Sequence, residues 1–191
     1  MEDRCMIDTK KKLKECLDLE EKLYRDIGYK GKLHGFITQC EVAKIYRFLE
    51  ILRKDEFYTN TCKGIIGKFR SVYYRRLHNK LGIQLGISIP VNVFKTGLLI
   101  YHSQGIIVHR DAKCGKYCKL HGFNCIGNNG RENGDSNAPI IGDYVDIGVG
   151  ASIIGAVEIA SDVKIAAHAL VCKSCSEEGS VLIGVPAEKK V

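Results

Sequence analysis

Histidine is the side chain best suited to move a proton near neutral pH, and the chain contains six histidines. Two of them, His102 and His121, lie 19 residues apart in the second half of the sequence. An imidazole can accept the proton of a hydroxyl group while that hydroxyl attacks a carbonyl carbon. A lone histidine is also a common structural residue, so its role depends on the element that carries it.

Thiol chemistry is the other possibility, because Cys172 and Cys175 form a Cys-x-x-Cys pair. This spacing occurs in zinc sites and in redox-active dithiols. No second pair lies at the spacing of a zinc site, and no thioredoxin-like pattern of strand and helix surrounds this one. The chain has nine cysteines, and an odd number fits reduced thiols that fill apolar space. We expect neither a metal site nor a disulfide framework.

The composition is that of a soluble globular protein, with 45% hydrophobic and 27% charged residues among 191. No apolar run approaches the length of about 18–20 residues that crosses a bilayer, and the start, MEDRCMIDTKKK, lacks the apolar core of a secretory signal. We therefore expect a cytoplasmic protein without a transmembrane segment.

Residues 1–86 are predicted to form a helical domain. Apolar residues recur at helical spacing over about 8–26 and 36–54, and a third helix is predicted to begin after 59–61 and to run to about residue 80. Gly82 and Gly86 are expected to end this helical region. The whole net charge of +7 falls here, with 19 Lys and Arg against 12 Asp and Glu.

The third predicted helix carries six basic residues, no acidic residue and the aromatic residues Phe69, Tyr73 and Tyr74. One interpretation is a surface for nucleic acid or an anionic membrane. The other is a solvated basic face with the aromatic rings packed inward. We favour the second and expect no nucleic-acid partner, because no nucleic-acid-binding motif accompanies the charge.

The second half changes to a six-residue period. An aliphatic residue recurs at this spacing without interruption, and a small or β-branched residue follows four places after each of the first five. The aliphatic positions are Ile141, Ile147, Ile153, Ile159, Ile165 and Val171, and an earlier series in the same period is Val108, Cys114, Leu120 and Ile126. Glycine directly follows several of them, where we expect a sharp turn or a positive φ.

Six residues match neither a helix nor an alternating strand, so the period describes one short strand and one corner, repeated. Three such units close one triangular coil, and stacked coils bury the aliphatic side chains inside a prism. Residues 87–191 are therefore predicted to form a parallel β-helix, which makes the chain an α+β protein. The interval from Ile126 to Ile141 is 15 residues, so the polar stretch 127–138 must leave the prism as a loop.

The second half resembles the hexapeptide-repeat acyltransferases, and within them the serine O-acetyltransferase branch. The resemblance covers about residues 87–190, and the helical first half is compatible with that branch. The stretches that carry it are IPVNVF (89–94), GLLIYH (97–102), IIV (106–108), APIIGD (138–143) and GVPA (184–187). It implies that the β-helix is left-handed, contrary to the usual hand of parallel crossovers.

The resemblance implies that His102 is the general base, which removes the proton of the acceptor hydroxyl as it attacks the thioester of acetyl-CoA. His121 lies about one 18-residue coil and one place after His102, so it lies near His102 on the adjacent coil. Two interpretations remain open: it assists the acceptor site, or it only lines a corner. Counting back six residues from Val108 would point His102 inward, but no clear repeat precedes it. His109 and His168 do not repeat the spacing of the zinc-binding members of this fold.

The resemblance also implies a groove for acetyl-CoA between neighbouring prisms, with Val149, Ala167 and Lys173 at the matching positions. Lys189 or Lys190 would meet the phosphates. Such a groove requires a homotrimer, and the helical domain would pair two trimers in the family arrangement.

Three departures from the branch concern the acceptor. Tyr101 precedes His102 where an aspartate is expected, Asn137-Ala138 replaces a second histidine before Pro139, and Ile87 replaces an acidic residue. The Leu120-His121-Gly122 context is similar to a variant subgroup linked to surface polysaccharides. The expected function is acetyl-CoA-dependent serine O-acetyltransfer in cysteine biosynthesis. The alternatives are a sugar or polysaccharide O-acetyltransferase and a noncatalytic scaffold or partner-binding subunit.

Overall fold

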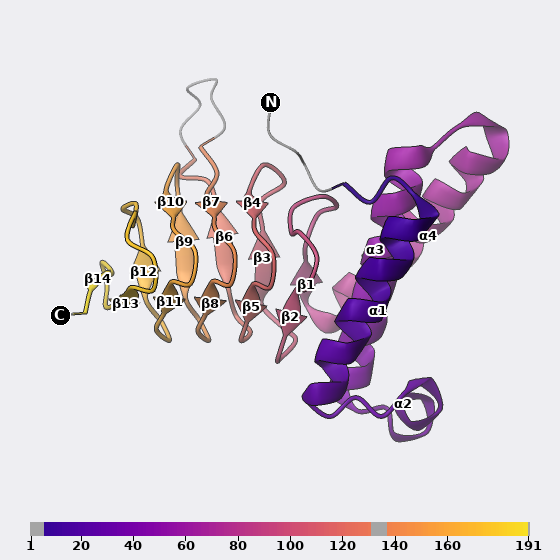
Figure 1. Cartoon of the computed structure of the whole chain (residues 1–191), viewed down its shortest axis with the longest axis horizontal. Coiled ribbons are helices and arrows are strands. Elements are labelled where there is room, and N and C mark those ends of the chain that lie inside the picture. Colours follow the sequence, from indigo (N-terminus) through magenta and orange to yellow (C-terminus); the bar gives the residue numbers. More distant parts are fainter. Residues whose placement is uncertain (1–5, 131–136, 191) are drawn as a thin grey trace. The chain divides into compact units, whose positions relative to one another are not determined.

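The computed structural model describes residues 6–130 and 137–190. The chain forms two compact units that divide between Leu85 and Gly86. The first is helical, and the second consists of short strands stacked coil upon coil (Figure 1).

The helical unit contains α1 (Lys10–Asp26), α2 (Lys32–Thr38), α3 (Glu41–Thr61) and α4 (Gly64–Leu85). Thr9 caps α1, because its hydroxyl accepts a hydrogen bond from the backbone N–H of Lys12 at 3.1 Å. The single helix predicted over 36–54 is instead the end of α2 and most of α3, which are separated where Gln39 adopts a left-handed conformation.

Gly82 does not end the helical region, contrary to the sequence prediction. It is buried within α4, which continues to Leu85, and Gly86 follows with φ of +65°. Glycine costs a helix only about 1 kcal/mol relative to alanine, and tertiary packing readily overrides such a preference. The buried positions of α4 are His78, Gly82 and Leu85, which share one helix face.

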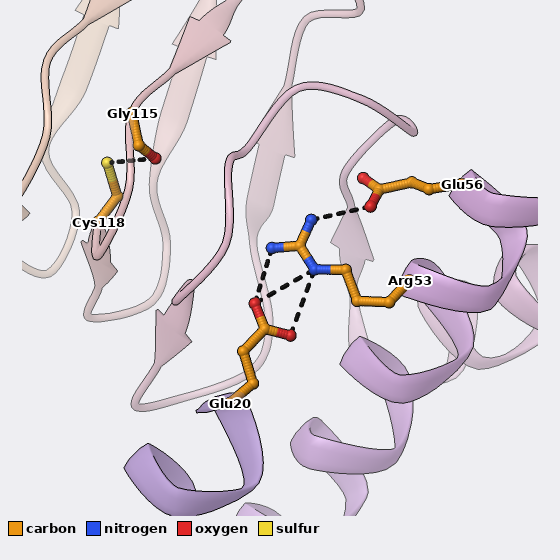
Figure 2. A network of polar contacts seen from close by, with 5 residues as sticks. All are labelled: Glu20, Arg53, Glu56, Gly115 and Cys118. Carbon is orange, nitrogen blue, oxygen red and sulfur yellow. Dashed lines mark hydrogen bonds and ion pairs between the residues drawn. The ribbon is translucent and has the colours of Figure 1, made fainter. Parts of the chain in front are cut away.

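A charged residue lies at the centre of the helical unit. Figure 2 shows Arg53 of α3 between Glu20 of α1 and Glu56, and all three side chains are almost completely buried. Its Nη2 lies 2.8 Å from Oε1 of Glu20 and its Nη1 lies 2.9 Å from Oε2 of Glu56. Burial alone would lower the pKa of Arg53, but the two carboxylates outweigh burial and raise it.

The expectation that the aromatic residues of α4 pack inward is wrong for Phe69 and Tyr73, whose exposed fractions are 74% and 58%. Tyr74 instead stacks on Tyr58 of α3, with ring centres 4.9 Å apart. The inward face of α4 is partly polar: Arg75 and His78 bind the buried carboxylate of Asp55 at 2.7 and 2.9 Å.

The second unit is a parallel β-helix of three sheets. Its strands are β1 (Ile87–Ser88), β2 (Leu99–Ile100), β3 (Ile106–Val108), β4 (Lys113–Cys114), β5 (Lys119–Leu120), β6 (Cys125–Gly127), β7 (Ile140–Ile141), β8 (Asp146–Ile147), β9 (Ser152–Ile154), β10 (Glu158–Ile159), β11 (Lys164–Ile165), β12 (Leu170–Val171), β13 (Val181–Ile183) and β14 (Glu188–Lys189). Sheet A has the order β1-β3-β6-β9-β12, sheet B β10-β7-β4, and sheet C β14-β13-β11-β8-β5-β2. All pairs are parallel except β13 with β14.

The six-residue period is confirmed by burial, since every aliphatic position of both series is at most 4% exposed. Ile141 pairs with Ile159 and Ile147 with Ile165, which is one 18-residue coil in each case. The coil that holds the predicted loop is nine residues longer, because Ile126 pairs with Ile153. The loop therefore leaves the prism without changing which side chains point inward; its central residues, 131–136, lie outside the described residues.

The glycines that directly follow the aliphatic positions allow close packing, and they lack the positive φ that was one of the two expectations. A Cβ on Gly142 would lie 2.6 Å from the backbone nitrogen of Ser161 in the next coil, and one on Gly148 would lie 2.7 Å from that of Ala167. The left-handed corner positions lie three places after the aliphatic residues and are occupied, among others, by Tyr144, Gly150 and His168.

Candidate active site

His102 lies at the corner between sheet C and sheet A, two residues after β2 ends at Ile100, and its side chain is exposed. The inward direction obtained by counting back from Val108 is wrong, because this coil is longer than 18 residues. Ile100 pairs with Leu120, which is 20 residues later. Ile100 and Val108 therefore both enter the core, and the two extra residues leave His102 outside.

Gly122 occupies the place directly below His102 on the next coil. A Cβ added to Gly122 would lie 3.3 Å from both the Cβ atom and the carbonyl oxygen of His102, and the φ of Gly122 is +100°. Any larger residue would press against the backbone that carries the histidine. Glycine at this position therefore allows the two coils to approach closely beneath His102.

The same corner continues down the prism and brings two of the predicted acetyl-CoA positions into line with His102. The N–H of Gly150 donates to the carbonyl of Gly122, and the N–H of His168 donates to the carbonyl of Val149. Val149 is 39% exposed, and Ala167 is exposed beside His168. His102, Val149 and Ala167 thus belong to one corner of the prism.

Asn124 supports this corner from inside and was not singled out from the sequence. It is fully buried: its Oδ1 accepts from the N–H of Gly122 at 3.0 Å, and its Nδ2 donates to the carbonyl of Gly148 at 2.7 Å. Asn124 follows Leu120 by four places, where the later repeats have valine or alanine. A polar residue at that position was the available signal.

His121 lies on the coil next to the one that carries His102, as the spacing of the two residues predicted. The N–H of Tyr101 donates to the carbonyl of Leu120, so the residue before His102 lies over His121. The two rings are stacked with centres 4.5 Å apart and an angle of 19° between their planes. Nε2 of His121 lies 2.8 Å from Oδ1 of Asp146 on the following coil.

Two lysines predicted to take part in acetyl-CoA binding, Lys173 in the groove and Lys189 at the phosphates, lie elsewhere. Lys173 follows β12 at the corner between sheets A and B, where Ser174 bonds to the backbone N–H of Glu158. Lys189 lies in β14 and forms an ion pair with Glu177. Within this one chain, neither lysine lies at the corner that carries His102.

The positions that depart from the serine O-acetyltransferase pattern are also placed. Ile87 is 5% exposed and belongs to the core, and Ala138 is 6% exposed.

Cys172 is exposed and Cys175 is half-buried. Across residues 6–130 and 137–190, no three His, Cys, Asp or Glu side chains converge as metal ligands. No helix in this part of the chain is long and apolar enough to span a bilayer.

Stacked three-sided coils with an exposed histidine at one corner define a hexapeptide-repeat protein of the acyltransferase type. No protein-family model matches the chain. It is 30% identical over 173 residues to the serine acetyltransferase of Helicobacter pylori (strain ATCC 700392 / 26695), which covers 89% of this chain and 92% of that protein. The chain belongs to the serine acetyltransferase family.

Several curated relatives are longer: the chain spans 58% of the serine acetyltransferase of Buchnera aphidicola subsp. Acyrthosiphon pisum and 46% of that of Mycobacterium tuberculosis.

Solved structures agree on the fold. The serine acetyltransferase of Neisseria gonorrhoeae in complex with serine matches with a TM-score of 0.68 and 22% identity, over 95% of this chain and 70% of that one. A serine acetyltransferase in complex with CoA matches with a TM-score of 0.68 and 20% identity, over 95% of this chain and 71% of that one. The predicted helical domain followed by a left-handed parallel β-helix is confirmed.

Proposed function

We propose that the protein is an acetyl-CoA-dependent serine O-acetyltransferase with His102 as the general base. The observation that carries the proposal is the position of His102, exposed at an open corner of the prism, in a chain of the serine acetyltransferase family. Relatives of this fold were solved in complex with serine and with CoA, which supports the same two substrates here.

Acetyl-CoA supplies the acetyl group as a thioester. In the transfer, a C–O bond forms to the acceptor hydroxyl and the C–S bond of the thioester breaks. His102 takes the hydroxyl proton, since a neutral hydroxyl is a poor nucleophile, and returns that proton to the departing thiolate. The chain's part in the chemistry is to hold one imidazole at a fixed, accessible place.

The corner below His102 suits an extended arm such as pantetheine. Val149 and Ala167 are exposed at this corner, and Ala167 presents only a methyl group. Backbone N–H and C=O groups at an open corner can pair with the amides of the arm. Lys173 remains a proposed position of the acetyl-CoA groove, and Lys189 or Lys190 remains the proposed phosphate ligand. Lys189 would have to exchange Glu177 for a phosphate.

We propose a homotrimer assembled through sheet A. The outward residues of its described strands are uncharged: Ser88, Ile107, Cys125, Ser152 and Leu170. Sheets B and C instead present charged residues, among them Lys113, Glu158, Lys119, Asp146 and Lys164. Ile107 is 58% exposed in the single chain, and such an apolar face favours burial against another copy.

If three copies pack through sheet A, one edge of the sheet in each copy lies beside the opposite edge of the sheet in its neighbour. One edge is the corner that carries His102, and the other carries Lys173. The cleft between copies would then hold both the base and Lys173 of the predicted acetyl-CoA groove, which neither edge provides alone. Pairing of two trimers through the helical unit is part of the same proposal.

The proposed compartment is the cytoplasm. None of the eight cysteines in the described residues forms a disulfide, and Cys62 and Cys172 are exposed thiols. Such thiols persist in a reducing environment.

A sugar or polysaccharide hydroxyl is the second candidate acceptor, and Tyr101 favours it. An aspartate is expected at this place in the serine O-acetyltransferase branch, whereas here an aromatic ring stacks on His121. The substitution removes a negative charge that would attract the ammonium group of serine.

Thiol release from acetyl-CoA tests these proposals. The full-length protein is mixed with acetyl-CoA and, in separate reactions, with L-serine, monosaccharides and oligosaccharides, and free thiol is measured over time. Serine-dependent release supports the leading proposal, and release with sugars alone supports the second. No release with any acceptor contradicts both and leaves a noncatalytic scaffold.

A further inference from the structure

The side chains of Tyr101, His121 and Asp146 form a column on the outer face of sheet C, one from each of three successive coils. Tyr101 is the residue before His102, and His121 is the residue before Gly122, which lies directly below His102. The column therefore borders the corner that carries the proposed base.

His121 is held on two sides. Its ring stacks on Tyr101 above, and its Nε2 lies 2.8 Å from Oδ1 of Asp146 below. Lys119 lies 3.9 Å from the other oxygen of Asp146, and the next strand places Lys164 opposite Asp146. The side chain of Asp146 is a carboxylate, and a carboxylate only accepts hydrogen bonds.

The proton arrangement of the neutral imidazole follows from that contact. Because Asp146 accepts, Nε2 carries the hydrogen and Nδ1 presents a lone pair. The contacts of His121 in the described part of the chain all involve Nε2 or the ring face, so its Nδ1 has no partner there. The His121 side chain is 35% exposed, so an outside molecule can reach it.

We propose that His121 binds the acceptor through Nδ1 and that Asp146 is the positioning residue that sets its orientation and proton arrangement. The proposal rests on the proposed acetyl transfer and deepens it. A lone pair recognises a hydrogen-bond donor, so the ligand is an acceptor with a donor group next to the reacting hydroxyl. In serine that donor is the ammonium group, and in a sugar it is the neighbouring hydroxyl. The serine O-acetyltransferase branch is expected to have an aspartate where this chain has Tyr101. His121 thus binds the donor group that such a carboxylate would otherwise bind.

The test compares His121→Gln and Asp146→Asn with two matched controls. His109→Gln is the same substitution at another imidazole beside a carboxylate, since His109 lies 3.8 Å from Asp111 and away from this corner. Lys119→Gln removes the ion pair with Asp146 but leaves the contact with His121. Acetyl-CoA binding to each variant reports that the fold and the cosubstrate site are intact.

Initial rates are measured with the acceptor that the wild-type protein uses and with its analogue lacking the adjacent donor: 3-hydroxypropionate for serine, or the deoxy sugar for a sugar. His121→Gln is expected to raise the KM for the acceptor about tenfold, the value of one lost hydrogen bond. The KM for acetyl-CoA should stay unchanged, and the preference for the acceptor over its analogue should fall by the same factor. Asp146→Asn should likewise raise the KM for the acceptor and lower the preference for the acceptor over its analogue. Both controls should match the wild type.

If His121→Gln and Asp146→Asn keep the acceptor KM and the preference of the controls, the assignment of His121 is overturned while acetyl transfer stands. A wild-type protein that transfers acetyl to no acceptor overturns the proposed function, and this assignment with it.

Discussion

Gly122 lies so close to His102 that a single added methyl group would lie 3.3 Å from both the Cβ atom and the carbonyl oxygen of the histidine. The position of the proposed base is thus set partly by a residue on the neighbouring coil that has no functional group of its own.

Gly122→Ala should lower kcat strongly while the protein still folds. The φ of +100° costs an alanine about 1–3 kcal/mol, and the new methyl group displaces the backbone of His102. A base displaced by a fraction of an ångström should lower kcat about 10- to 100-fold. Steady-state thiol release and thermal unfolding measure the two effects.

Gly179→Ala is the control for backbone strain, because Gly179 also has a positive φ, +69°, but nothing lies within 4 Å of an added Cβ. Equal losses of kcat in the two variants would mean that strain alone, rather than contact with His102, explains the effect.

The cysteines should divide into reactive and protected groups. Burial raises the pKa of Cys118 to about 12, and burial also raises the pKa of Cys114. A thiol reacts as the thiolate, so both should resist alkylation in the folded protein, whereas the exposed Cys62 and Cys172 should react readily.

Peptide mapping after treatment with iodoacetamide, without and with urea, measures this division. Modification of Cys114 or Cys118 at the rate of Cys172 in the folded protein would show that these two side chains do not lie inside the prism.

The helical unit should lose stability in acid through Asp55. Burial would raise the pKa of this carboxyl, but hydrogen bonds from His78 and Arg75 outweigh burial and lower it below the ordinary value of 3.8. A carboxyl with a lowered pKa stabilises the folded state above its ordinary pKa, and this contribution disappears as the pH falls below that value.

Urea unfolding of the wild type and of Asp55→Asn from pH 7 to pH 3 measures the effect. The wild type should be more stable by roughly 1–3 kcal/mol above about pH 5, and the difference should shrink toward pH 3. A difference that does not change with pH would show that the charge of Asp55 contributes nothing.

The β-helix could be predicted because its signal is periodic and purely apolar. Each aliphatic position such as Ile147 meets its counterpart above and below, so spacing alone identifies the inward side chains. The helical unit was less predictable. The break at Gln39 and the continuation of α4 through Gly82 depend on packing between helices, which no local pattern records.

The site was predictable only in part. His102 was identified from its sequence context, and the nearness of His121 followed from the length of a coil. The contact between His121 and Asp146 on the following coil could not be predicted in this way, because the nine-residue loop insertion separates the two residues by 25 positions. The orientation of His102 was hidden by two extra residues in its own coil. Asn124 is a support whose role appears only when three coils are stacked.

The central claim is that His102 is the base for acetyl transfer from acetyl-CoA, and His102→Ala tests it most directly. The assay combines thiol release with the preferred acceptor and equilibrium binding of acetyl-CoA to the same preparation. Turnover should fall about 10²- to 10⁴-fold, while acetyl-CoA binds with unchanged affinity. Turnover within about threefold of the wild type, with binding intact, would contradict the assignment of His102 as the base.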